Sequence, residues 1–366
     1  MLINCSCLRG EKLELIEEAH IFLEGKKVIS VGDGFDPEGL DLRGFLAMPG
    51  LINAHTHIGD AFAKEACAGL RVDDAVGRKG LKWKLYRESE RRLRVLAMKE
   101  AAIEMVESGV TSHADFREGG SEGLEELRDA TKALPLRTIA LGRNLDRKFE
   151  CCSGLGLNLY QVRQQLPKTK DRKNMILALH AGEKKGEVSV ALGYDPDIIV
   201  HFTHCSQKDI KEAARKKVSV VVCPRSNAAL GVGFPPVANL LEKGVNCAIG
   251  TDNVMINSPD MWREMEFLYK YSALDGALEA CDLLRMACVN AAKALRTDSG
   301  SIEHGKRADL IFIDRDAPNL RHSRNLLATL VSRCRHDNVR KVMIDGAFVI
   351  DKDRQPSMGR ILRSNA

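Results

Sequence analysis

Strand-length apolar runs alternate with amphipathic segments through the middle of this chain, and this alternation constrains its fold more than any other feature. Seven runs are long enough for a strand: 45–54, 110–116, 136–141, 175–179, 198–201, 218–223 and 246–251. We take the segment 151–158 as an eighth. Helical patterns separate most of the runs and are clearest at 88–107, 207–217, 237–243, 261–271 and 279–295. Strands that alternate with helices pair in parallel, and about eight such units predict a (β/α)8 TIM barrel over residues 48–303.

Both ends of the chain carry short strand patterns instead. Residues 19–23 and 27–31 alternate apolar and polar side chains on either side of a Glu-Gly pair, which is a hairpin signal. The C-terminal stretch repeats this style at 308–313, 339–344 and 348–350. We therefore expect a small β-sandwich domain formed by residues 1–47 and 304–366 together.

Two helix starts are indicated by their cap residues. Ser206 is followed three residues later by Asp209, which resembles a capping box at the start of the 207–217 helix. Ser258 and Pro259 offer an N-cap and a first-turn proline for the 261–271 helix.

Composition narrows the class of protein. With 44% hydrophobic and 29% charged residues the chain is typical of globular proteins, and no apolar run nears the roughly 18 residues of a membrane span. The net charge of +5 comes from scattered Lys and Arg, so we expect neither a nucleic-acid nor a membrane partner. The start of the chain lacks a signal-peptide pattern, which favours a cytoplasmic location. The eleven cysteines lack paired C-x-x-C spacing and are expected to be mostly reduced, buried thiols.

Histidines stand where several of the expected barrel strands end. His55 and His57 are two residues apart, so a strand would point both imidazoles to the same side. His180 and His201 stand at the ends of two later apolar runs, and Asp252 follows another in the same way. Side chains at the C-terminal ends of barrel strands converge on one face. Three imidazoles and one carboxylate form a suitable ligand set for Zn²⁺ or another divalent first-row ion.

A series of motifs resembles the amidohydrolase superfamily, in the deaminase branch that holds cytosine, guanine and S-adenosylhomocysteine deaminases and the triazine hydrolases. The matching stretches run nearly from end to end: PGLINAHTH, LHAGE, VHFTH, CPRSNAALGVGFPPVANLLEKGVNCAIGTDN, DMWREME and GSIEHGKRADLIFID. This resemblance implies one divalent metal ion per subunit, held by His55, His57, His180 and Asp252. We expect Zn²⁺, with Fe²⁺ as the alternative. No lysine clearly ends the fourth strand, so a bridged pair of metal ions is not expected.

The resemblance also implies which side chains take part in a reaction. Glu183 would shuttle protons, His201 would hold the attacking oxygen, and Asp252 would accept a proton from water as well as bind the metal. A divalent ion lowers the pKa of a coordinated water from 15.7 to about 7, which makes a hydroxide nucleophile available at neutral pH. The implied reaction replaces an amino group on a purine, pyrimidine, nucleoside or related nitrogen heterocycle and releases ammonia.

Two alternative functions stay open at this point. An enzyme of the same fold could hydrolyse a cyclic amide or a ring C–Cl or C–N bond, and release of ammonia would separate it from a deaminase. A binding protein that had kept the barrel would carry at least one damaged ligand or acid, and none is damaged here. His204 competes with His201 for the catalytic role, and His201 aligns better with the family's histidine.

Further polar residues near the strand ends are candidate substrate contacts. His113 ends the second strand, and a core or capping role is its alternative. Arg143 follows the third strand and could meet a substrate anion, although for Arg143 and Arg117 we favour a solvated loop. His204 is expected in the wall of the pocket.

Two more features of the sequence bear on the site and its substrate. Ser226 and Asn227 follow the seventh strand and are expected to order the site. Between His113 and His180 the chain has no histidine, where many adenosyl and guanine deaminases of this family carry one. This absence argues against specificity for adenosylhomocysteine and leaves the exact heterocyclic substrate open. A homo-oligomer is left open.

Overall fold

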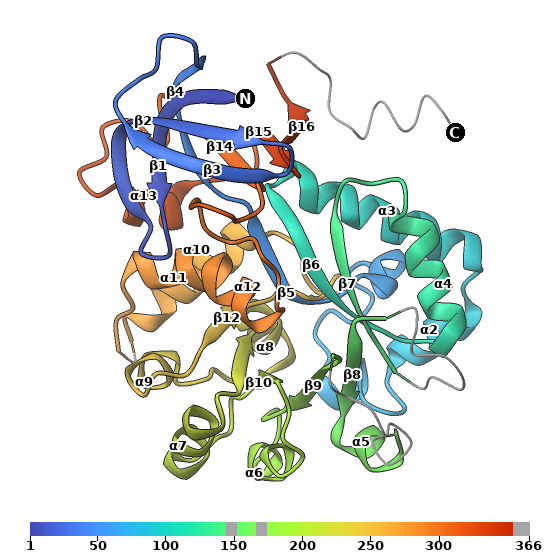
Figure 1. Cartoon of the computed structure of the whole chain (residues 1–366). Helices are drawn as coiled ribbons and strands as arrows, with labels where there is room; N and C mark the ends of the chain where they lie inside the picture. The colour runs from blue at the N-terminus through green and yellow to red at the C-terminus, as the bar shows by residue number, and fades with distance from the viewer. Residues whose placement is uncertain (144–151, 166–173, 275, 354–366) are drawn as a thin grey trace.

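A computed structural model describes residues 1–143, 152–165, 174–274 and 276–353 and shows a barrel with a second sheet beside it (Figure 1). The barrel strands are β5 (Leu51–His57), β6 (Val110–Arg117), β7 (Arg137–Gly142), β8 (Gly154–Asn158), β9 (Ile176–Ala181), β10 (Ile198–His201), β11 (Ser219–Val222), β12 (Cys247–Ile249) and β13 (Asp252–Asn253). Their order is β12-β11-β10-β9-β8-β7-β6-β5-β13, and every pairing is parallel.

The two edges of this sheet meet through one short piece of chain. β12 pairs with β11, and two residues later β13 pairs with β5. Between them, the backbone N–H of Thr251 donates to the carbonyl of His55 at 3.1 Å. The sheet therefore curls round into a TIM-like barrel, and its eighth strand is the segment that contains β12 and β13. The segment 151–158, which was predicted as an additional strand, contributes β8 between β7 and β9.

Helices connect the strands, and most of them lie around the outside of the barrel (Figure 1). They are η1 (Ile58–Ala63), α1 (Val72–Ala75), α2 (Leu81–Glu88), α3 (Arg91–Glu107), α4 (Gly120–Thr131), α5 (Leu159–Gln165), α6 (Glu187–Leu192), α7 (Gln207–Lys216), α8 (Pro224–Leu230), α9 (Val237–Glu242), α10 (Met261–Ser272), α11 (Ala280–Ala287), α12 (Val289–Ala294) and α13 (Leu326–Arg333). Because strands of such a barrel are covered on both faces, they are apolar without alternation, which is the pattern seen in the sequence.

Two of the expected helices differ from the prediction, one by a break and one at its start. The segment 279–295 forms α11 and α12 rather than one helix, because Cys288 leaves helical geometry with φ −129° and ψ −81°. The capping box of Ser206 and Asp209 is confirmed at α7. The expected cap at Ser258 is wrong. Asp260 caps α10 instead, because its carboxylate accepts from the backbone N–H of Trp262 at 2.9 Å.

Both ends of the chain build a second sheet. Its strands are β1 (Leu2–Arg9), β2 (Glu14–Glu24), β3 (Lys27–Asp33), β4 (Leu40–Pro49), β14 (Leu310–Asp314), β15 (Val339–Ile344) and β16 (Ala347–Asp351). The expected hairpin is β2 and β3. β4 pairs with β14, so the two ends join in one ladder with the order β16-β15-β14-β4-β1-β2-β3. The described strands from the two ends of the chain thus form one continuous sheet, and the expected two-sheet sandwich is not confirmed. Residues 354–366 lie outside the described part.

The first apolar run, 45–54, divides between the two sheets at Gly50. The strand before it, β4, joins the terminal sheet, and the strand after it, β5, begins the barrel. A Cβ added at Gly50 would lie 2.3 Å from Cγ2 of Thr111, so only glycine fits at this crossing. The Gly50 N–H donates to the carbonyl of Asp309 at 2.9 Å.

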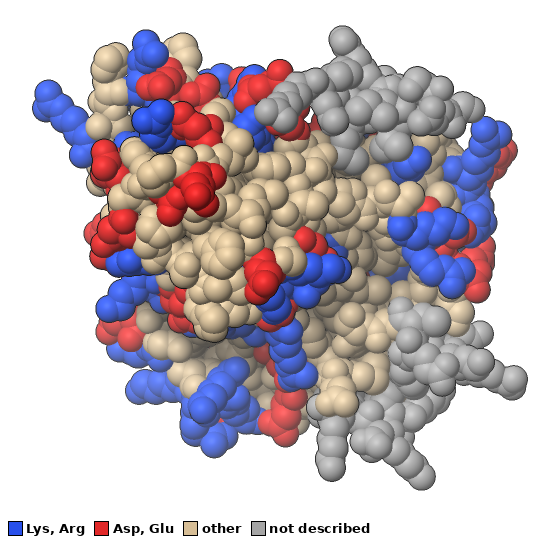
Figure 2. Space-filling model, turned by 45° about the horizontal axis from the view of Figure 1, so that its top comes forward, with Lys and Arg blue, Asp and Glu red and all other residues tan. Residues whose placement is uncertain are grey.

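Surface and thiol features agree with the composition. On the face drawn in Figure 2, Lys and Arg lie among Asp and Glu rather than in one basic patch. Within the described residues, no helix is long and apolar enough to cross a bilayer. The ten described cysteines are free thiols, most of them buried, as the spacing indicated.

Candidate active site

Four side chains meet at the C-terminal end of the barrel. His55 and His57 come from β5, His180 from β9 and Asp252 from β13. Nε2 of His55 lies 3.2 Å from Oδ1 of Asp252, and Nε2 of His180 lies 3.3 Å from Nε2 of His55. Nε2 of His57 lies 3.3 Å from Nε2 of His180 and 3.6 Å from Oδ1 of Asp252. These four atoms form what we call the ligand cluster.

The spacing of the ligand cluster fits one metal ion. Tetrahedral zinc ligands at about 2.0–2.1 Å from the ion lie about 3.4 Å from one another. The four separations of 3.2, 3.3, 3.3 and 3.6 Å fall on both sides of this value. Burial lowers the pKa of His57 to about 3 and holds that of His180 well below its usual value, so both rings are neutral, which metal binding requires.

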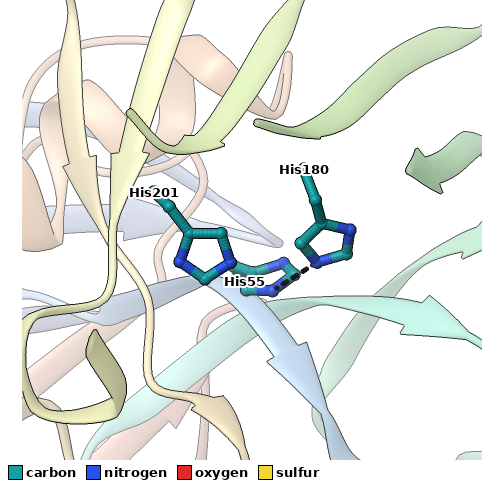
Figure 3. Close-up of side chains that lie close together, drawn as sticks. All are labelled: His55, His180 and His201. Carbon is teal, nitrogen blue, oxygen red and sulfur yellow. Dashed lines mark hydrogen bonds between the residues drawn. The ribbon is translucent and has the colours of Figure 1, made fainter. Parts of the chain in front are cut away.

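His201 stands at the edge of the ligand cluster. Figure 3 shows its ring beside those of His55 and His180, and ring nitrogens of these three histidines lie within 4.8 Å of one another. Nδ1 of His201 is 2.9 Å from Oδ1 of Asn227. An amide oxygen only accepts, so Nδ1 of His201 donates this hydrogen bond and Nε2 is the ring nitrogen that faces the pocket. Nε2 lies 3.9 Å from Oε1 of Glu183.

Glu183 lies in the loop after β9, and its carboxyl lines the pocket. Burial raises the pKa of this carboxyl above its usual value. The loop depends on Gly182, which has φ +101° and would place a Cβ 2.8 Å from Cα of Phe202. His201 and Asp252 also have positive φ, of 77° and 62°. Such strained non-glycine backbone is common at functional sites.

His113 and His204 were both expected near the substrate, and neither lines the pocket. His113 is buried in β6, with Nδ1 3.1 Å from Oγ1 of Thr56 and Nε2 3.0 Å from Oγ1 of Thr138. It does not line the pocket, so the core role fits it better than substrate contact. His204 is half-buried after β10 and does not line the pocket either, whereas His201 does.

Arg143 and Arg117 are not in solvated loops. Arg143 is buried in the pocket wall, where Nη2 lies 3.5 Å from the carbonyl of Phe116. Arg117 is fully buried at the end of β6, and its Nη2 donates to Oε2 of Glu118 at 2.9 Å. The preference for a solvated loop is therefore wrong for both, because each guanidinium has a buried carboxylate within ion-pair distance.

Glu118 and Lys82 are site residues that the sequence analysis missed. Glu118 follows β6, and its Oε1 lies 2.7 Å from Nδ1 of His57 and 2.7 Å from Nζ of Lys82. Lys82, on α2, also pairs with Asp60 at 3.0 Å. Burial opposes ionisation of Glu118, yet the nearby cations, Lys82 foremost, hold its carboxyl pKa well below the usual value. A charged residue at a strand end was the available signal for Glu118. Nothing in the sequence marked Lys82.

Two residues expected to order the site do so. Oγ of Ser226 donates to Oδ2 of Asp252 at 2.6 Å. Asn227 holds His201, and its own Nδ2 donates to Oγ1 of Thr203 at 3.0 Å, which fixes the orientation of the amide. Ser226 thus contacts the oxygen of Asp252 that is not in the ligand cluster, and Asn227 contacts the ring nitrogen of His201 opposite Nε2.

A pocket of about 440 Å³ opens over the ligand cluster. Its floor is formed by His57, His180, His201, Glu183 and Asp252. Its walls hold aromatic and amide side chains, among them Trp83, Tyr160, Asn158, Gln161 and Gln164. Charged side chains line it as well, among them Asp73, Arg78 and Lys184, so the pocket offers both apolar and polar contacts to a small molecule.

Comparison with known proteins agrees with this geometry. The chain matches the Amidohydrolase family over residues 46–187 and 161–349. A putative aminohydrolase from Methanothermobacter thermautotrophicus is 30% identical over 384 residues, which cover 94% of this chain and 98% of the relative. A 5-methylthioadenosine/S-adenosylhomocysteine deaminase from Thermoanaerobacter pseudethanolicus is 29% identical over 405 residues, covering 93% and 91%.

A solved structure shares the fold. An adenosine deaminase from Xanthomonas campestris with bound zinc superposes with a TM-score of 0.80 at 23% identity, covering 100% of this chain and 96% of its own. The family match across the barrel and the full-length similarity to the relative from Methanothermobacter thermautotrophicus show that the chain belongs to the amidohydrolase family.

Proposed function

We propose that this protein is a metal-dependent aminohydrolase that replaces an amino group on a nitrogen heterocycle by a carbonyl and releases ammonia. The observation that carries the proposal is the ligand cluster beside Glu183 at the floor of one pocket. Relatives named as an aminohydrolase and as a deaminase are similar to this chain over nearly its whole length, which supports the same reaction.

The metal site is proposed to hold one divalent ion through His55, His57, His180 and Asp252. We expect Zn²⁺, with Fe²⁺ as the alternative, because imidazole and carboxylate ligands suit both. The bound ion would supply a water nucleophile at neutral pH.

The side chains around the pocket divide the proton transfers between them. Glu183, which burial keeps in its protonated form to a higher pH, donates a proton to a ring nitrogen and then serves the leaving amine. Asp252 accepts one proton of the attacking water, while Oγ of Ser226 donates a hydrogen bond to Oδ2 of Asp252. Nε2 of His201 accepts a hydrogen bond from the same water and holds its oxygen as the tetrahedral carbon forms. Glu183, now a carboxylate, takes the proton of the new hydroxyl and passes it to the amino nitrogen. The bond from carbon to that nitrogen then breaks, so that ammonia leaves and a ring carbonyl remains. The proton on Asp252 finally returns to Glu183, which restores both groups.

The substrate is proposed to be a small aminated heterocycle such as a purine, pyrimidine or nucleoside. Arg143 is a candidate contact in the pocket wall. Hydrolysis of a cyclic amide or of a ring C–Cl or C–N bond is the alternative reaction on this fold. The deaminase relatives favour ammonia release over this alternative.

A screen for ammonia tests the proposed function. Zinc-loaded protein is incubated with aminated purines, pyrimidines, nucleosides and pterins, and ammonia is measured together with substrate loss. We expect at least one member to lose one amino group for each ammonia formed. A member that is consumed without ammonia would contradict deamination and support the alternative reaction.

A further inference from the structure

We propose that Glu118 sets the affinity of this site for its metal ion by positioning His57, and that Lys82 opposes it through the same carboxylate oxygen. The inference rests on the metal site of the proposed function and adds two residues to it. Neither residue contacts the metal in this proposal, and both act through the imidazole of His57.

The contact between Glu118 and His57 fixes the ring in its ligating form. Oε1 of Glu118 is 2.7 Å from Nδ1 of His57, and the carboxylate side chain is only 2% exposed. An ionised carboxylate only accepts hydrogen bonds, so Nδ1 must carry the proton. The lone pair of the ring is then on Nε2, the atom that lies 3.3 Å from Nε2 of His180 within the ligand cluster.

Glu118 is surrounded by cations that keep it available as an acceptor. Arg117 lies 2.9 Å from Oε2, and Arg143 lies 3.6 Å from Oε1. All three side chains are buried, so water does not screen these charges strongly. A carboxylate on the far nitrogen of a ligating histidine fixes its tautomer and raises its basicity, and loss of such a partner costs about 10–100-fold in metal affinity.

Lys82 competes with His57 for one oxygen. Nζ of Lys82 is 2.7 Å from Oε1 of Glu118, the same atom that His57 contacts at 2.7 Å. The ammonium therefore draws negative charge away from the bond to His57 and adds a positive charge close to a site for a cation. Without Lys82, Arg117 and Arg143 still face Glu118 and keep it an acceptor, and Asp60 keeps its bonds from Asn253 and from the backbone N–H of Met255. Removing the charge of Lys82 is therefore expected to strengthen metal binding, which is opposite to the effect of removing the carboxylate.

The experiment measures zinc affinity of the full chain by competition with a chromophoric chelator. We expect Glu118→Gln to bind zinc about 10–100-fold more weakly than the wild type, and Lys82→Met to bind it several-fold more tightly. Asp309→Asn is the matched control. Asp309 is also a buried, ion-paired carboxylate, but it contacts Arg137, which begins β7 at the opposite end of the barrel strands, and it accepts from the backbone N–H of Asp345. The Asp309→Asn variant should bind zinc with the same affinity as the wild type.

The outcomes separate the inference from the proposed function. If the wild type binds no zinc, the metal site itself is wrong. If the wild type binds zinc and Glu118→Gln binds it equally well, only the positioning role is wrong. A loss of affinity in both Glu118→Gln and Lys82→Met shows a merely structural network and also overturns the inference. Circular dichroism of the metal-free variants reports folding, and either folded variant alone tests the predicted direction.

Discussion

Most of the side chains proposed to act in this site accept or donate a hydrogen bond through an atom that is not itself proposed to react. Glu118 holds His57, Ser226 holds Asp252, and Asn227 holds His201. Each contact uses the atom that the ligand cluster or the substrate does not need, so the reactive atom is aimed before any ligand binds. His55 differs, because its buried Nδ1 has no hydrogen-bond partner among the described residues.

Residue-level prediction from sequence succeeded where a short-range pattern marked the chemistry. The two-residue spacing of His55 and His57 and the strand-end place of His180 were sufficient to expect a common site. Glu118 and Lys82 were missed because their partners lie far away in sequence, 61 residues from Glu118 to His57 and 36 residues from Lys82 to Glu118. A lone charge after a strand looks the same whether it is solvated or buried.

Glu183→Gln tests the proton shuttle. The amide keeps the size of the side chain but cannot donate and take back a proton, so we expect turnover to fall by about 10²–10⁴-fold. The metal content should be unchanged, because Glu183 is not in the ligand cluster. Rates of ammonia release and elemental analysis of the same sample check both points. Full turnover in a variant that retains its metal would show that another group shuttles the proton.

At the scale of elements, the apolar runs predicted the barrel strands well because buried parallel strands are apolar throughout. The boundaries were less predictable. The run 45–54 is continuous in hydrophobicity, yet close packing against Thr111 at Gly50 divides it between two sheets. The helix over 279–295 breaks at Cys288 although its apolar pattern continues. The packing of Gly50 against Thr111 is a tertiary contact, which a local pattern does not contain.

Gly182→Ala tests the loop that carries Glu183. The variant combines an unfavourable positive φ with a Cβ 2.8 Å from the Phe202 backbone. Gly186→Ala is the matched control, with φ +84° and nothing within 4 Å of its Cβ. We expect Gly186→Ala to lose about 1 kcal/mol of unfolding free energy from the backbone alone. Gly182→Ala should lose clearly more in urea titrations and should also lose activity. Equal losses in the two variants would refute the close contact.

Glu264 links α10 to α8, and we expect it to make the free energy of unfolding depend on pH. Its buried carboxyl accepts from the backbone N–H of Arg225 at 3.1 Å, and burial raises its pKa from 4.5 to about 8. The folded state therefore holds the proton more tightly than the unfolded state. The resulting stability is complete below about pH 4.5, falls as the pH rises, and is lost above about pH 8.

Glu264→Gln removes this dependence. We expect the unfolding free energy of the wild type, relative to that of Glu264→Gln, to decrease between pH 5 and pH 8. Denaturant titrations of both proteins across this range check the trend, since the other titrating groups cancel in the difference. Parallel curves would mean that Glu264 ionises normally.

At the scale of the whole molecule, the proposed ligands come from three strands that are far apart in the chain. β5 begins the barrel, β9 lies near its middle, and β13 closes it. An ion bound by all three would hold the closed sheet together. We expect chelation to lower the unfolding free energy, by about 2.7 kcal/mol relative to protein in free zinc at 100 times its dissociation constant.

Thermal unfolding with and without chelator measures this effect. Addition of zinc in excess of the chelator should restore the original midpoint. A midpoint that does not respond to chelation or to added zinc would indicate that no ion bridges these strands.

The most direct test of the proposed reaction is the ammonia formed per substrate consumed, measured with the same substrate for zinc-loaded protein, chelated protein and Glu183→Gln. The metal-dependent deaminase predicts one ammonia per substrate for the loaded protein and almost none for the other two. Substrate loss without ammonia, or undiminished ammonia release after complete removal of the metal, would contradict it.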